Sequence, residues 1–115
     1  MDPDCLFCKI VAGEIPGEKV YSDEQVTAFR DIHPVAPTHI LIVPNKHLAS
    51  TNEISAGDEQ LVGHLFNVAR QLADQEGIDE SGYRLIINTG PDAGQVVFHL
   101  HLHLIGGHRM RHPMG

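Results

Sequence analysis

The chain has 115 residues, 42% of them hydrophobic and 20% charged, with a formal net charge of −7, and such a composition is typical of one soluble domain spanning residues 1–115. The acidic balance argues against binding to long nucleic acids, because their phosphates require a basic surface. The sequence shows no leader-like start and no apolar run of ~20 residues, which predicts a cytoplasmic protein without a membrane contact.

The first half of the sequence predicts a short helix and three strands. Residues 5–12 form a short helical turn that ends before a Pro-Gly turn. The three strands are expected at residues 20–22, 26–30 and 39–43. The first two strands form a hairpin around Asp23 and Glu24. Residues 31–37 contain two prolines and are therefore expected to form an extended loop.

A long amphipathic helix follows these strands. Ser55 can cap a helix that runs to about Glu76 and ends at Gly77. Asp58 and Glu59 lie in its first turns, where their charge complements the helix dipole. The apolar residues recur at steps of three and four, which is the pattern of one buried face: Leu61, Leu65, Val68, Ala69 and Leu72.

The last third predicts two more strands, at residues 83–88 and 96–105, joined by the glycine-rich loop 89–95. Short turns connect most of the strands, and a single long helix interrupts them. We therefore expect an α+β fold with a five-stranded, mainly antiparallel sheet, one long helix and a short N-terminal helix.

Histidines alternate with apolar residues along the final expected strand. The apolar set should pack against the core and comprises Phe98, Leu100, Leu102 and Leu104. The opposite face then carries a row of three imidazoles, from His99, His101 and His103. The plain alternative is a solvated strand face or an adventitious metal site, although Thr or Lys would serve a polar face equally well.

A row of this kind suits chemistry at phosphorus. Neutral imidazole is a good nucleophile when one ring nitrogen is free and the other carries a proton held by a carbonyl or carboxylate. His101 is the candidate nucleophile, and its two neighbours can bind phosphate oxygens. The loop from Gly90 to Gln95 offers backbone N–H groups to an anion. No carboxylate lies near the row in sequence, so a phosphatase built on Asp or Glu metal ligands is not indicated.

Cys5 and Cys8 form a C-x-x-C pair near the start of the chain. In a protein of cytosolic type, this pair is more often half of a metal site or a redox pair than a structural disulfide. Two reduced, buried thiols that pack as small apolar groups are the alternative. A thioredoxin-like redox pair is less favoured, because no βαβ pattern surrounds the motif.

Several segments that together cover nearly the whole chain match one known family. They are Phe29-Arg30-Asp31-Ile32-His33-Pro34, Ala36-Pro37-Thr38-His39-Ile40-Leu41, Gly82-Tyr83-Arg84-Leu85, Asn88, Gly94-Gln95, His99-Leu100-His101-Leu102-His103-Leu104-Ile105 and Gly106-Gly107. The chain thereby resembles the histidine triad (HIT) family, and within it the nucleotide-binding branch of purine nucleoside phosphoramidases. The resemblance implies a HIT-like fold and a homodimer with a continuous ten-stranded sheet. It also implies cleavage of the P–N bond of adenosine 5′-phosphoramidates, which yields AMP and an amine without any cofactor in the chemistry.

The same resemblance assigns roles to individual residues. The catalytic cluster would be His39, His99, His101 and His103. Within it, His101 would attack the α-phosphorus and His103 would contact the phosphate. Asp31 would bind the ribose hydroxyls, while Asn88 and the backbone at Gly94 would bind the phosphate. The base pocket would be lined by Phe7, Ile10, Phe29, Ile32 and Leu41.

The resemblance also completes the cysteine half-site. Some bacterial members bind zinc through two cysteines and two histidines at positions that correspond here to Cys5, Cys8, His47 and His99. Four protein ligands fill the coordination shell of zinc, so a bound ion would be structural and would not act as a Lewis acid.

Two features depart from the family pattern. Many members carry a serine that meets the phosphate, and Val96 stands at that position here. One hydrogen bond worth about 1.5–3 kcal/mol is therefore missing or comes from a backbone group. Several relatives also have a C-terminal tryptophan that shapes the leaving-group pocket, and this chain contains no Trp.

Three functions are consistent with these residues. The leading hypothesis is a phosphoramidase that acts on a purine nucleotide substrate. The second is a dinucleoside polyphosphate hydrolase or nucleotidyl transferase, which would share the covalent intermediate and differ in its leaving group. The third is a nucleotide-binding adaptor whose activity is incidental. Turnover of a phosphoramidate and of diadenosine tetraphosphate separates the first two, and AMP binding without turnover of either favours the third.

Overall fold

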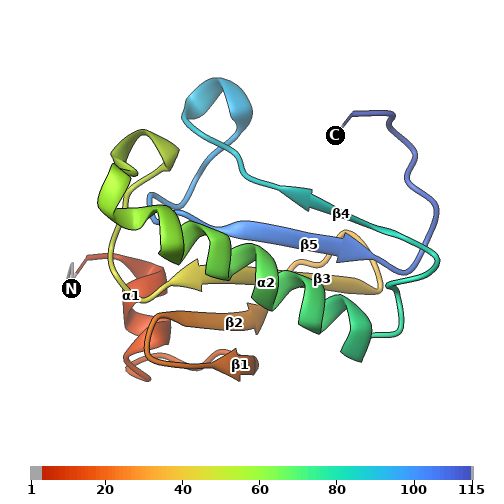
Figure 1. Ribbon diagram of the computed structural model, residues 1–115, viewed down its shortest axis with the longest axis horizontal. Helices are drawn as coiled ribbons and strands as arrows, with labels where there is room; N and C mark the ends of the chain where they lie inside the picture. Colours follow the sequence, from red (N-terminus) through yellow and green to blue (C-terminus); the bar gives the residue numbers. More distant parts are fainter. Residues whose placement is uncertain (1–3, 115) are drawn as a thin grey trace.

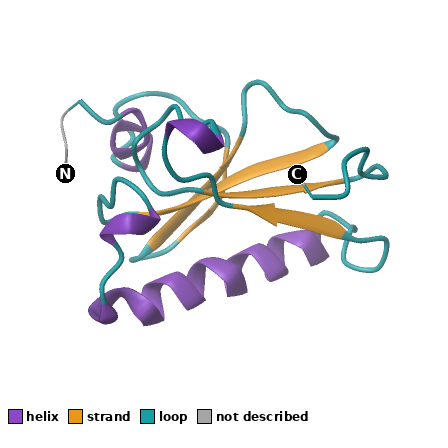
Figure 2. Ribbon diagram, turned by 90° about the horizontal axis from the view of Figure 1, so that it is seen from above, coloured by secondary structure: helices purple, strands orange, loops and turns teal. Residues whose placement is uncertain are grey.

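The structure, a computed structural model that describes residues 4–114, is a five-stranded sheet with helices on both faces (Figures 1 and 2). The strands lie in the order β1-β2-β3-β5-β4, and all neighbouring pairs are antiparallel. Their bounds are Lys19–Ser22 (β1), Val26–Arg30 (β2), Thr38–Pro44 (β3), Tyr83–Ile86 (β4) and Leu102–Gly106 (β5). The long helix α2, Glu59–Gln75, covers one face, and the short helix α1, Leu6–Val11, lies over the other. The expected α+β fold is confirmed.

Helix α2 is held on the sheet by the apolar face that its sequence predicts. Every member of that periodic set is buried in the interface with the strands. The chain enters through a 3₁₀ turn, η2 at Ala56–Asp58, so regular α-helix begins at Glu59 and not directly after Ser55. Ser55 is still the N-cap residue of this entry turn, and the Asp58 side chain accepts its backbone N–H over 3.0 Å as the return bond of a capping box.

Alternation along the central strands divides the apolar side chains into two cores. On β3, Ile40 and Ile42 point towards α2 and belong to the larger core. Leu41 and Val43 point the opposite way and join Phe29 in a smaller core. That smaller core is completed by residues from the N-terminal segment, namely Cys5, Phe7, Cys8 and Ile10. The N-terminal helix therefore packs against the same sheet face as the histidine row.

The final strand is shorter than its alternating pattern predicts. It begins at Leu102, so His99 and His101 precede it, and Phe98 is 57% exposed rather than packed in the core. The ladder with β3 ends at the pair Ile42 and Leu102. Continued pairing would bring Pro44 of β3 opposite this segment, and proline has no N–H to donate. The prediction of a strand over residues 96–105 was wrong for its first half.

Other segments differ from expectation in smaller ways. Strand β4 ends at Ile86, whereas the sequence predicts a strand through Asn88. The glycine-rich loop contains a 3₁₀ turn, η3 at Pro91–Ala93, and a further 3₁₀ turn, η1 at Thr51–Glu53, precedes α2. Within residues 4–114, no helix is long and apolar enough to cross a membrane.

Candidate active site

The three histidines still share one face although the strand is shorter than predicted, because side chains keep alternating through the irregular segment. Leu100, Leu102 and Leu104 are buried in the core beneath α2. The three histidines lie on the opposite face, where the ring centroids of His101 and His103 are 4.9 Å apart. Phe7 of α1 packs edge-on against His101, with ring centroids 5.1 Å apart. The row is thus enclosed from one side by the N-terminal helix.

The surroundings of His101 assign its two ring nitrogens. Its Nδ1 lies 2.7 Å from the carbonyl oxygen of His99, which can only accept a hydrogen bond. Nδ1 therefore carries the proton, and Nε2 keeps a free lone pair in the plane of the ring. Burial lowers the pKa of His101, so the ring is neutral at pH 7. This is the state in which an imidazole attacks phosphorus.

A second pair of histidines is assigned by the same reasoning. The backbone N–H of Val35 donates to His39 Nδ1 over 3.2 Å, so the proton of neutral His39 is on Nε2. His39 Nε2 lies 3.0 Å from His103 Nδ1 and donates to it. His103 must then carry its own proton on Nε2. Burial, together with the nearby His101 and His39, lowers the pKa of His103 to about 4, so both rings are neutral at pH 7.

Asp31 is the carboxylate closest to this pair. Its Oδ1 accepts the backbone N–H of His33 over 2.8 Å, and its Oδ2 lies 3.5 Å from His39 Nε2. Asp31, His39 and His103 are close enough together to suggest a metal site. The assignment of His39 argues against one, because the ring nitrogen that faces the other two residues carries the proton. These groups instead present a carboxylate and a chain of hydrogen-bond donors.

An apolar cavity of about 670 Å³ opens beside these residues. Most of the residues expected to bind substrate line it: Phe7, Ile10, Phe29, Asp31, Ile32 and Leu41. Phe7 and Phe29 meet edge to face with ring centroids 5.3 Å apart. Ile32 is 84% exposed and so stands at the mouth and not in the interior. A flat aromatic ring fits such an apolar slot, and Asp31 and His39 supply polar groups at its edge.

Two residues expected to bind phosphate are placed differently. Asn88 lies beyond the end of β4 and lines a separate hollow with Ala93. The N–H of Gly94 donates to the carbonyl of Pro91 over 3.0 Å within the 3₁₀ turn, so it is not free for an anion. The sequence interpretation did not single out Val97, which lines the cavity together with Val96, and it noted Val96 only as the residue that replaces a serine. The feature of the sequence that could have indicated both valines is their position directly after the glycine-rich loop.

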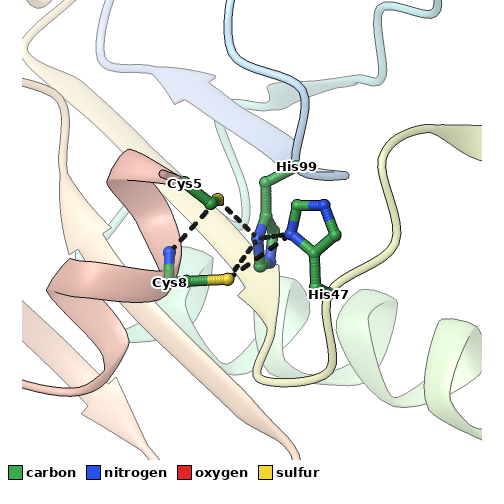
Figure 3. Close-up of side chains that lie close together, drawn as sticks. All are labelled: Cys5, Cys8, His47 and His99. Atoms are coloured by element: carbon green, nitrogen blue, oxygen red, sulfur yellow. Dashed lines mark hydrogen bonds between the residues drawn. The ribbon is translucent and has the colours of Figure 1, made fainter. Parts of the chain in front are cut away.

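The two cysteines and two further histidines form a separate cluster at the end of the row (Figure 3). Cys5 Sγ lies 3.2 Å from His99 Nδ1, and Cys8 Sγ lies 3.4 Å from His47 Nδ1. The two Nδ1 atoms are 3.2 Å apart. Tetrahedral zinc with bonds of 2.0–2.3 Å holds its ligand atoms about 3.3–3.8 Å apart. The four ligand atoms therefore have nearly the spacing that one zinc ion requires.

The protonation of His99 supports the same conclusion. Its Nε2 lies 2.8 Å from the carbonyl oxygen of Pro44 and must carry the proton. His99 Nδ1 consequently directs a lone pair at the two sulfurs and at His47, as a metal ligand does. The residues present fit a zinc ion, and the contact with Pro44 supplies the outer support that ligating histidines usually have.

The comparisons with known proteins agree with this geometry. Residues 12–110 match the HIT domain family. The chain is 53% identical over 107 residues to the purine nucleoside phosphoramidase of Escherichia coli K12, covering 93% of this chain and 90% of the relative. It is 47% identical over 116 residues to the 14 kDa zinc-binding protein of Zea mays, covering 99% of this chain and 90% of that protein. The crystal structure of a HIT family hydrolase from Legionella pneumophila Philadelphia 1 superposes with a TM-score of 0.95 at 49% identity, covering 97% of this chain and all of that one.

Proposed function

Because the chain belongs to the HIT domain family, we propose that it hydrolyses the P–N bond of purine nucleoside 5′-phosphoramidates to a nucleoside monophosphate and an amine. The observation that supports this proposal most directly is the hydrogen bond from His101 Nδ1 to the carbonyl of His99, which leaves Nε2 as the nucleophilic atom. The similarity to the Escherichia coli enzyme supports the same substrate class.

The first step forms a bond between His101 Nε2 and the α-phosphorus and breaks the P–N bond. The electron pair of the broken bond stays on the amine nitrogen, which also takes up a proton from the solvent. The carbonyl of His99 keeps its hydrogen bond to Nδ1 and stabilises the positive charge that the ring acquires. His103 lies beside His101, with ring centroids 4.9 Å apart, and the orientation of its Nε2–H is fixed because His39 holds the other nitrogen.

The second step returns His101 to its starting state. Water attacks the phosphorus and gives up a proton to the solvent. The bond from phosphorus to Nε2 breaks, and the ring recovers its lone pair while AMP leaves. His103 is neutral and keeps its proton on Nε2, so this N–H can donate to a phosphate oxygen, whereas the Nε2–H of His39 is used on His103. No cofactor enters either step.

Substrate binding divides between an apolar and a polar region. We assign the purine base to the cavity lined by Phe7, Phe29 and Leu41. Asp31 would accept hydrogen bonds from the ribose hydroxyls, and His103 would donate to the phosphate. Asn88 and the loop at Gly94 remain proposed phosphate contacts, although the Gly94 N–H would first have to leave Pro91.

The decisive experiment is mass spectrometry of the protein quenched during turnover of an adenosine phosphoramidate. We expect an adduct of one nucleoside monophosphate on His101 in the wild type and none in His101→Ala. The kcat of His101→Ala should fall by at least about 10³-fold, because the nucleophile itself is lost. The exposed His112 provides a matched control, and His112→Ala should keep both the adduct and the rate.

The same assay separates the alternatives. Faster turnover of diadenosine tetraphosphate than of the phosphoramidate would favour a polyphosphate hydrolase. Tight AMP binding without turnover of either compound would favour an adaptor. Full activity in His101→Ala would exclude the covalent mechanism altogether.

We also propose a homodimer and a structural zinc ion. Strand β4 forms an edge of the sheet and all four of its residues are half-buried, so a second copy could extend the sheet there. Sedimentation at twice the mass of the chain would support this arrangement. Cys5, Cys8, His47 and His99 would hold the zinc, and its contribution would be to fix α1 against the histidine row.

A further inference from the structure

Gln95 occupies an unusual position at the end of the glycine-rich loop. Residues 91–94 are exposed, whereas Gln95 is only 5% exposed. Its Oε1 accepts the backbone N–H of Gly90 over 2.9 Å. Its Nε2 donates to the carbonyls of Ala49 and Val97 over 2.8 and 3.1 Å. Both N–H groups of the side-chain amide therefore donate hydrogen bonds, and both acceptors are backbone carbonyls.

These contacts join three segments that the sheet does not connect. The backbone N–H of Gln95 also donates to the carbonyl of Gly90 over 3.1 Å, which closes the loop upon itself. The contact with Ala49 attaches the loop to the segment that follows β3. A further bond, from Leu100 N–H to the carbonyl of Leu48 over 2.7 Å, attaches the histidine segment to the same place.

The loop has few other means of holding its shape. Gly90 and Gly94 have φ values of 81° and 84°, where glycine is the favoured residue and offers no side chain to pack. The chain between this loop and Leu102 has no ladder partner in the sheet. It nevertheless contributes Val96 and Val97 to the cavity wall. The same segment carries His101.

We propose that Gln95 is a positioning residue for the reaction, which sets the place of the segment 96–101 relative to the cavity and so aims His101 and the phosphate-facing backbone. The proposal rests on the function proposed above. Gln95 acts through the backbone of its neighbours and does not itself touch the reacting atoms. Its effect should therefore fall on steps that involve phosphorus and leave recognition of the base unchanged.

The test uses two variants of the full chain. Gln95→Met keeps the length of the side chain and removes its three hydrogen bonds, and Gln95→Glu replaces the two N–H donors with an oxygen that faces two carbonyls. We expect kcat for an adenosine phosphoramidate to fall by about 10- to 100-fold in both, as it does when groups at the reacting centre are displaced. Adenosine, measured by calorimetry, should bind as in the wild type, while AMP should bind more weakly. Gln60→Glu, at an exposed site on α2, should match the wild type.

A second measurement does not depend on turnover. The ring proton on His101 Nδ1, which is held by His99, should exchange with solvent faster in Gln95→Met than in the wild type by NMR. Unchanged kcat and unchanged exchange in both variants would refute the role of Gln95. Equal losses of adenosine and AMP binding would also refute it, since they would show a merely structural role. If the wild type fails to cleave phosphoramidates, the proposed function falls, and the exchange measurement still decides whether Gln95 positions His101.

Discussion

Backbone groups place the protons of His39, His99 and His101, and the proton of His103 follows from its contact with His39. Carbonyls of His99 and Pro44 accept from His101 and His99, and the N–H of Val35 donates to His39. Carbonyls only accept and amides only donate, so these three contacts decide which nitrogen of each ring is free. The sequence predicts that a held proton is needed, but it could not show which backbone group would hold it, since these carbonyls belong to an irregular segment and to a strand end.

The lowered pKa values predict how stability depends on pH. His103 has a pKa of about 4 in the folded chain and about 6.5 in the unfolded one. Between these values the unfolded chain binds more protons, so folding is favoured less as pH falls. The contribution of His103 is fully present above pH ~6.5 and is lost towards pH ~4, a change on the order of 3 kcal/mol.

Thermal unfolding at a series of pH values checks this expectation. The Tm should fall between pH 6.5 and 4.5, and His103→Gln should reduce the slope. Asp58 and Glu76 also have lowered pKa values, but the stability that such carboxylates contribute is lost only at more acid pH, where they become protonated. The exposed His112 offers a control, since His112→Gln should keep the slope. Equal Tm values at pH 7 and pH 4.5 would contradict the prediction.

Among the elements, helix α2 shows how well periodicity predicts burial. Leu65 is completely buried against the sheet, and the next residue, Phe66, is 42% exposed. Leu65→Ala should lower the free energy of unfolding by about 2–5 kcal/mol, because it removes apolar contacts and leaves a cavity. Phe66→Ala on the opposite side should change it by less than about 0.5–1 kcal/mol. Urea denaturation of the two variants measures both, and similar losses would show that the helix is oriented differently.

The last strand shows where periodicity is insufficient. Alternation correctly separates leucines from histidines, because a side chain's face depends on local backbone direction. Alternation does not determine whether the neighbouring strand has backbone groups left for pairing. At Pro44, the neighbouring strand has no N–H to donate. Contacts between elements far apart in the sequence could not be predicted either. His64 of α2, for example, bonds to Asp23 of the first hairpin over 2.6 Å, across 41 positions.

At the scale of the whole molecule, the proposed zinc ligands Cys5, Cys8, His47 and His99 join α1 to the segments that follow β3 and precede β5. Chelation should therefore lower the Tm by at least about 5 °C, since a ligand bound at 100 times its Kd contributes about 2.7 kcal/mol. The kcat at 25 °C should change much less, because no step of the reaction uses the ion. Cys8→Ser should reproduce the low Tm without a chelator. A chelated protein with an unchanged Tm would show that the cluster holds no structural metal.

How far the whole molecule could be predicted depends on the source of each inference. Composition and periodicity predict one long helix and an antiparallel sheet, and the motif around the histidines predicts the family. The order of the strands, the partition of the apolar residues into two cores and the closeness of the two cysteines to His47 and His99 depend on long-range packing. The closeness of the cysteines to His47 and His99 was predicted from the resemblance to a family, because the spacing alone left several interpretations of the cysteine pair.

His99 acts at two places, through its side chain and through its backbone. Its imidazole faces the thiols, while its peptide oxygen accepts a hydrogen bond from the ring of His101, the proposed nucleophile. His99→Ala keeps the peptide oxygen and removes the imidazole, so an inactive variant would report the lost anchor and any backbone shift that follows from it. Such a result could be mistaken for proof of a third acid–base group. Replacing Cys8 disturbs the anchor but leaves the His99 ring and its bond to the Pro44 carbonyl in place, so the difference between the two phenotypes isolates what the imidazole does beyond the anchor.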